Sequence, residues 1–122
     1  MDFETLRVIA EEEVAAVVRA LPEPLRIRAR KLPVTFESRP NRLFRRDGIE
    51  ADTLGLFVGP AFADEERTSS PVPPQIILFL ENLWECAEFH EGCYRQEVRD
   101  TFLHELGHYL GLDEDDLLGR GL

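Results

Sequence analysis

The chain has 122 residues, 43% of them hydrophobic and 31% charged, and this balance predicts a single soluble globular domain over residues 1–122. The formal net charge of −10 argues against a nucleic-acid-binding protein, because contacts to phosphate require an excess of Lys and Arg. No apolar run is long enough to span a membrane, and the acidic N-terminus lacks the features of a signal peptide. We therefore expect a cytoplasmic protein with neither nucleic acid nor membrane as a partner.

The first element predicted is a helix over residues 2–21. Asp2 is a favourable N-cap residue. Apolar residues then recur at helical spacing, namely Phe3, Leu6, Ile9, Val14, Val17, Val18 and Leu21. Pro22 and Pro24 end this helix and predict the start of a short second helix that reaches Lys31.

Positive charge is concentrated in residues 22–46. The basic residues of this segment are Arg26, Arg28, Arg30, Lys31, Arg39, Arg42, Arg45 and Arg46. We interpret them as a solvated face that balances acidic neighbours such as Glu11, Glu12 and Glu13, since most charge runs are solvated faces. A patch that recruits an acidic partner or RNA is the alternative.

Three short segments predict β-strands, at residues 33–38, 53–59 and 76–80. The last is apolar on both faces, which predicts a central or covered strand. Between the first two, Asp47 and Gly48 predict a turn. Residues 59–75 contain four prolines and predict a long loop, of the kind that often shapes a functional site.

A short helix is predicted at residues 81–89, and the segment after it holds two cysteines around a histidine. Cys86, His90 and Cys93 are three potential ligands, whereas a structural zinc site usually has four. We interpret both cysteines as reduced, partly buried thiols. A local disulfide is the next alternative, and it depends on the separation of the two Cα atoms.

The last long helix, predicted at residues 94–111, contains the sequence HELGH at residues 104–108. At about 100° per residue, His104 and His108 project from one face of this helix. The apolar residues fall on the opposite side, namely Val98, Phe102, Leu103, Leu106, Tyr109 and Leu110. Two imidazoles four residues apart can bind one Zn²⁺ ion per chain, and Glu105 is placed as general base toward the water that zinc activates.

A catalytic zinc normally has three protein ligands, so one more residue is needed. Gly111 predicts the end of the helix, after which the chain can turn back and place an acid beside the metal. The spacing H-E-x-x-H-x-x-G-x-x-E makes Glu114 the expected third ligand, with Asp113 and then Asp115 or Asp116 as alternatives. These acids can instead cap a last helical turn.

The sequence EVRDTFLHELGHYLGLDEDDL, within residues 96–117, resembles the small bacterial zincin-like metallopeptidases sometimes called minimal zincins. These carry the motif H-E-x-x-H-x-x-G-x-x-[DE] near the C-terminus. A looser resemblance covers LGLFVGPAF and PQIILFLENL. The resemblance implies an α+β fold, with a small mixed β-sheet packed against an N-terminal helix and a C-terminal H-E-x-x-H helix.

The same resemblance implies roles for individual residues. His104, His108 and Glu114 correspond to the zinc ligands of the family, and Glu105 corresponds to the general base. The strand before the motif helix, residues 76–80, is implied to form the rim of the cleft and to pair with an extended peptide.

These observations predict a zinc-dependent metallopeptidase that hydrolyses peptide bonds of a peptide or protein substrate through a zinc-activated water. A non-catalytic, zinc-containing module that binds peptides by strand addition is the alternative. A third interpretation is a metal-independent interaction protein that uses residues 26–46.

Overall fold

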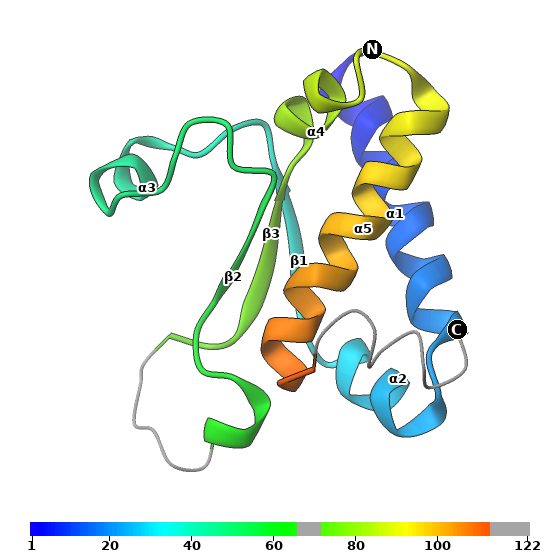
Figure 1. Ribbon diagram of the computed structural model, residues 1–122, viewed down its shortest axis with the longest axis vertical. Helices are drawn as coiled ribbons and strands as arrows, with labels where there is room; N and C mark the ends of the chain where they lie inside the picture. The colour runs from blue at the N-terminus through cyan, green and yellow to red at the C-terminus, as the bar shows by residue number, and fades with distance from the viewer. Residues whose placement is uncertain (66–71, 113–122) are drawn as a thin grey trace.

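Two helices begin the fold, as the sequence predicts. The computed structural model describes residues 1–65 and 72–112 (Figure 1). Helix α1 spans Phe3–Ala20, and the Asp2 carboxylate caps it by accepting a 2.8 Å hydrogen bond from the Thr5 N–H. Helix α2 spans Glu23–Arg30 and starts at the prolines that end the first helix.

Three strands form one mixed sheet, and all three were predicted from the sequence. They are β1 (Val34–Glu37), β2 (Gly55–Val58) and β3 (Gln75–Phe79). The strand order is β1-β3-β2, with β1 parallel and β2 antiparallel to β3. Residues 76–79 are all buried, which confirms the prediction that this apolar segment is a central strand.

The central position of β3 overturns one implication of the family resemblance. A strand can pair with a peptide only through a free edge, and both edges of β3 are occupied, one by β1 and the other by β2. The prediction that residues 76–80 pair with an extended peptide is therefore wrong. The strand beside the last helix that has an edge on the outside of the sheet is β2.

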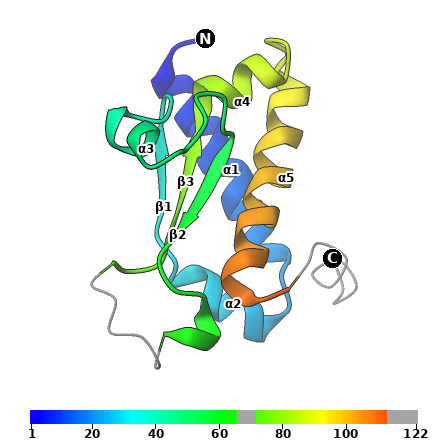
Figure 2. The ribbon, with the colours of Figure 1, turned by 60° about the vertical axis from the view of Figure 1, so that its left-hand side comes forward.

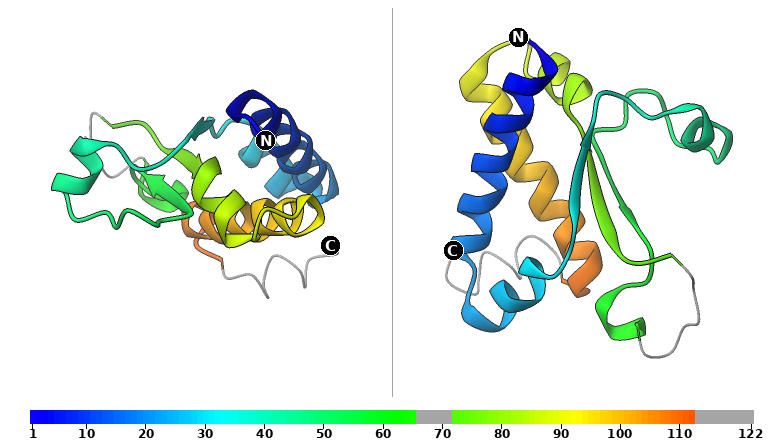
Figure 3. Two further views of the ribbon diagram at one scale, coloured as in Figure 1. Left: turned by 90° about the horizontal axis from the view of Figure 1, so that it is seen from above. Right: turned by 180° about the vertical axis from the view of Figure 1, so that it is seen from behind.

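Helix α3, Arg42–Arg46, was not predicted. The Asn41 side chain caps it by accepting a 3.0 Å hydrogen bond from the Phe44 N–H. The predicted turn at Asp47 and Gly48 is present, and Gly48 takes a φ of 90°, which favours glycine. This turn ends α3 instead of joining two paired strands, because β1 and β2 both pair with β3. Figures 1 and 3 show α3 well separated from the other helices, and Figure 2 shows it on the side of the molecule that comes forward in that view.

The last two helices are α4 (Leu80–Cys86) and α5 (Glu91–Leu110). Helix α5 begins earlier than predicted, because His90 Nδ1 caps it by accepting a 3.4 Å hydrogen bond from the Cys93 N–H. Gly111 ends it with a φ of 71°, as predicted. No disulfide joins Cys86 and Cys93, which fits their interpretation as free thiols, but both side chains are exposed, so the prediction that they are partly buried is wrong.

The core lies between the sheet and the helices α1, α4 and α5, which pack on one side of it (Figures 1 and 3). The buried Tyr94 hydroxyl of α5 donates a 2.9 Å hydrogen bond to the Leu6 carbonyl of α1. Glu13 of α1 is also buried and pairs with Arg99 of α5. These contacts hold α5 at a fixed position against the sheet.

The ion pairs of α1 differ from those expected. Glu11 pairs with Arg7 of the same helix, and Glu12 pairs with Arg95 of α5 at 3.2 Å. Within the described residues, the basic segment 22–46 makes its ion pairs through Arg39, which binds Glu81 and Glu85 of α4. The basic face therefore does not balance the acidic residues of α1.

Candidate metal centre

The two histidines of the HELGH sequence and the glutamate between them form a compact cluster on α5. The potential ligand atoms of His104, Glu105 and His108 all lie within 4.8 Å of one another. The two imidazole rings are 4.6 Å apart between centroids, and His108 Nδ1 lies 3.5 Å from Glu105 Oε1. Tetrahedral zinc with bonds of about 2.0–2.1 Å would require two ligand atoms to lie roughly 3.4 Å apart, so this spacing is compatible with a shared metal ion.

The two faces of α5 explain why this cluster points outward. Val98, Phe102 and Leu106 are buried against the sheet and α1, so the opposite face of the helix is left toward solvent. His108 lies on that face, with 55% of its side chain exposed, whereas Glu105 lies at its margin, with only 10% of its side chain exposed. Two solvent-accessible imidazoles beside a sheltered carboxylate suit a metal and a proton acceptor.

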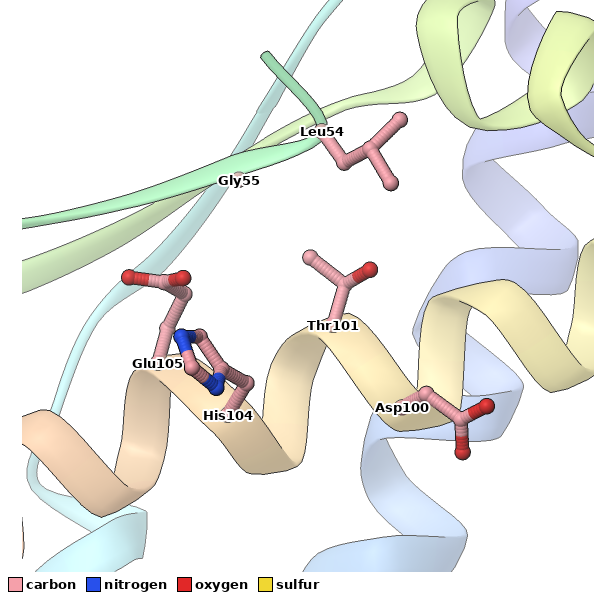
Figure 4. Close-up of a pocket in the computed structure, with 6 residues that line it drawn as sticks. All are labelled: Leu54, Gly55, Asp100, Thr101, His104 and Glu105. Carbon is pink, nitrogen blue, oxygen red and sulfur yellow. The ribbon is translucent and has the colours of Figure 1, made fainter.

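A cavity of about 350 Å³ opens beside this cluster, between α5 and β2 (Figure 4). Helix α5 contributes Asp100, Thr101, His104 and Glu105 to its lining, and the chain entering β2 contributes Leu54 and Gly55. The sequence assigned a role only to the histidine and the glutamate among these six residues. The other four belong to the site because the sheet places β2 against the helix.

Gly55 allows β2 to approach α5 closely. A Cβ atom at this position would lie 2.6 Å from Thr101 Cγ2 and 3.2 Å from Leu78 Cδ2, well inside normal contact distance. Gly55 does not have a positive φ, so the absence of a side chain, and not backbone freedom, is what the site requires here. Glycine thus fixes the width of the cavity.

We expect Gly55→Ala to destabilise the protein by about 1–3 kcal/mol, the usual cost of forcing an extra methyl group into a packed site. Thr101→Ser removes the clashing Cγ2 atom, so the double variant is expected to recover most of that loss. Urea unfolding of the wild type, the two single variants and the double variant measures the coupling. Strictly additive effects would show that the methyl group meets no resistance from Thr101.

Asn82 of α4 positions the start of β2, and sequence reasoning missed it. Its buried side-chain amide donates hydrogen bonds to the Ala51 carbonyl (2.8 Å) and the Thr53 carbonyl (2.9 Å). Arg39 in turn donates a 2.6 Å hydrogen bond to Asn82 Oδ1. The segment that leads to Leu54 and Gly55 is therefore anchored to α4 rather than carried by the strand alone.

Tyr109 ties the start of the proline-rich segment to the C-terminal end of α5. Its hydroxyl donates a 2.7 Å hydrogen bond to Glu65, and its ring contacts Phe57 of β2 and Phe62 of the short 3₁₀ helix η1 (Phe62–Asp64). Burial, and then the hydrogen bond to Glu65, raise the pKa of Tyr109 to about 12. The phenol is therefore neutral under ordinary conditions and acts as a donor.

Replacing Tyr109 with Phe is expected to lower the free energy of unfolding by about 0.5–1.5 kcal/mol at neutral pH, because one partly buried hydrogen bond is lost. The folded-state pKa is raised above the ordinary value of 10.0, so this stabilisation is complete below pH 10 and is lost as the pH rises toward 12. The stability difference between wild type and variant should narrow over that window. Chemical denaturation across pH 7–12 measures it, and a constant difference would contradict the assignment.

Glu114, the expected third ligand, and its alternatives Asp113, Asp115 and Asp116 lie outside the described residues. Within residues 1–65 and 72–112, the cluster on α5 is the one group of three or more potential metal ligands. Cys86, His90 and Cys93 do not form such a group there.

Comparison with known proteins agrees with the fold and the cluster. The family model described as zincin-like metallopeptidase matches residues 29–121, three quarters of the chain. The chain belongs to the zincin-like metallopeptidase family. A search among curated proteins finds no match. In this zincin-like chain, α1 lies outside the matched residues, yet it packs against α5 and completes the core.

Family membership implies a zinc cofactor, and the donor chemistry of the cluster fits that ion. Imidazole nitrogen and carboxylate oxygen are both common zinc ligands. Among the described residues, no helix is both long and apolar enough to cross a membrane.

Proposed function

We propose that this protein is a zinc-dependent metallopeptidase that hydrolyses peptide bonds of peptide or protein substrates in the cytoplasm. The observation that carries this proposal is the joint placement of His104, Glu105 and His108 beside a cavity and beside the outer edge of β2. A group of potential metal ligands alone supports only the binding of a metal ion. A free strand edge alone supports only the recognition of a peptide. Their adjacency supports hydrolysis of a bound peptide.

The residues proposed to hold the zinc ion, one per chain, are His104, His108 and Glu114. A zinc ion in such a site polarises the scissile carbonyl group and lowers the pKa of water toward neutrality. The two imidazoles bind as neutral ligands, so metal binding is expected to weaken as acid protonates them.

Glu105 is proposed as the general base and then the general acid. Its carboxylate takes a proton from the attacking water and later delivers it to the nitrogen of the leaving amine, so a single group serves both steps. The low exposure of Glu105 supports this role, because a sheltered carboxylate exchanges its proton with the substrate in preference to bulk water.

The edge of β2 is proposed to orient the substrate. The Phe79 N–H donates a 3.0 Å hydrogen bond to the Leu54 carbonyl, and hydrogen bonds alternate along an antiparallel pair. Leu56 and Val58 therefore face β3, whereas the N–H and C=O groups of Gly55 and Phe57 face outward. In the described part of the chain, no strand pairs with this edge. An extended peptide can add there as a further strand.

The first test is metal content together with hydrolysis. We expect about one zinc per chain by plasma mass spectrometry and cleavage of a mixed peptide library by the zinc-loaded protein. His108→Ala removes one ligand and is expected to lose both the bound zinc and the hydrolysis. Its zinc affinity should fall by more than the roughly 10–100-fold that follows loss of an outer-shell partner. Glu114→Ala and Asp113→Ala, measured in parallel, identify the third ligand.

Two outcomes would contradict the proposal in different ways. Zinc binding with no cleavage above that of metal-free protein would leave a zinc-containing peptide-binding module, which the open edge of β2 also suits. An absence of zinc after loading and removal of free metal would remove the basis for any metal-dependent function.

A further inference from the structure

One carboxylate in the cavity has no part in the proposed chemistry. Asp100 lines the cavity and is exposed, one helical turn before His104 on α5 (Figure 4). Its partner is neutral, since Gln96 donates a 2.7 Å hydrogen bond to Asp100 Oδ1. Among residues 1–65 and 72–112, no Arg, Lys or His lies within ion-pair distance of it. Asp100 therefore places a negative charge at the end of the cavity farther from Glu105 (Figure 4).

No neighbouring side chain in the cavity neutralises the negative charge of Asp100. Arg99, the next residue along the helix, points to the other side and pairs with Glu13 of α1. None of the six residues lining the cavity is Lys or Arg. Zinc, if held as proposed, would offset the negative charges of Glu105 and of the predicted ligand Glu114, whereas Asp100 would keep its charge. The net charge of −10 for the whole chain adds to the attraction of cations.

The relative direction of β2 and α5 also determines which way a bound peptide would run past the histidines and Asp100. From Leu54 to Gly55 and from Asp100 to Glu105, β2 and α5 advance toward the same side of Figure 4. A peptide antiparallel to β2, the more stable pairing, therefore passes the histidines first and Asp100 afterwards. Asp100 precedes the midpoint of the two histidines by about 9 Å along the helix axis. That distance is two to three residues of extended chain at about 3.3 Å each.

We propose that Asp100 is a specificity-determining residue that selects peptides with a Lys or Arg side chain two or three residues after the scissile bond. This inference rests on the proposed peptidase function and adds to it the chemistry of the preferred substrate. The ammonium or guanidinium group forms a charge-assisted hydrogen bond with the Asp100 carboxylate. The long apolar stem of either side chain spans the distance between the peptide backbone and the carboxylate.

The test uses quenched fluorescent peptides of one sequence, with the scissile bond located by mass spectrometry. Lys, norleucine or Glu is placed one, two or three residues after that bond. Wild-type protein is expected to prefer Lys over norleucine by about three- to fivefold in kcat/KM at low salt, the upper part of the range of an exposed ion pair. The preference should fall in 0.5 M salt. Asp100→Asn should reduce it to within about twofold, and Asp100→Lys should favour Glu.

The matched control is Asp47→Asn, which removes the same charge at an exposed position on the C-terminal end of α3. It is expected to keep the preference for Lys, which excludes a general effect of net charge. A second arm compares N-acetylated and free-amine peptides, because a free α-amine offers the same positive charge as lysine. A preference that depends on the α-amine and not on the side chain overturns the proposal.

A binding measurement separates this inference from the proposed function. Fluorescence anisotropy of the same peptides with the zinc-loaded Glu105→Gln variant reports recognition without turnover. Tighter binding of the Lys peptide, lost when Asp100→Asn is added, supports the role of Asp100 even if the wild type hydrolyses nothing. Equal binding of the Lys, norleucine and Glu peptides overturns the proposal, even if the wild type is an active peptidase.

Discussion

Glu105→Gln is expected to lower kcat for peptide hydrolysis by about 10²–10⁴-fold, the usual contribution of a general acid–base residue. Glutamine keeps the size of the side chain in a position that is only 8% exposed, so the packing of α5 should be preserved. The amide cannot accept a proton from the attacking water, and it cannot return one to the leaving amine. Steady-state kinetics and zinc content, measured on the same preparation, test this result.

The zinc content is the decisive control for this variant. Because His104 and His108 remain in place, about one zinc per chain is expected in Glu105→Gln, so a loss of rate cannot be assigned to a loss of metal. Glu91→Gln makes the same chemical change at an exposed position in the first turn of the same helix and should keep full activity. Unchanged kcat in Glu105→Gln, with zinc bound, would show that another group moves the proton.

The elements that the sequence predicted well are those whose pattern is local. Helices α1 and α5 carry continuous apolar stripes, and the prediction of the opposed faces of α5 rests only on the angle between successive side chains. The predicted end of α5 is correct at Gly111, because a residue type with a special backbone conformation marks it. His104, Glu105 and His108 lie within a single turn of one helix, so their proximity also follows from sequence.

The features that were missed depend on contacts between distant segments. A strand apolar on both faces predicts a central position, yet it does not say which neighbours will pair with it. The outer edge of β2 beside α5 was therefore not foreseen. The roles of Gly55 and Asn82 cannot be predicted from their residue types. Gly55 matters because β2 packs against Thr101, and Asn82 matters because it holds the segment before β2 against α4. The early start of α5 depends on a histidine cap, and histidine is not among the preferred N-cap residues.

The HELGH sequence contributes residues to both the buried and the exposed face of α5, so a substitution within it can have a large effect on stability. Leu106, in the middle of the sequence, is 0% exposed, whereas His108 lies on the exposed face two residues later. Leu106→Ala is expected to lower the free energy of unfolding of the metal-free protein by about 2–5 kcal/mol, because it leaves a cavity between α5 and the sheet. Domains of this size are stable by about 5–15 kcal/mol, so this loss is a large share of the total.

His108→Ala is the matched comparison, since it makes the same residue type in the same helical turn. In metal-free protein its effect should stay within about 0.5 kcal/mol, as for most exposed positions. With zinc the order of the two effects should reverse for metal affinity: His108→Ala loses the ion, and Leu106→Ala retains it at temperatures where the chain is folded. Urea unfolding without metal and zinc titration with metal give the two rankings. If one variant were the more damaging in both measurements, the core face and the metal face of α5 would not be separate, and the assignment of the histidines to a metal site would lose its structural basis.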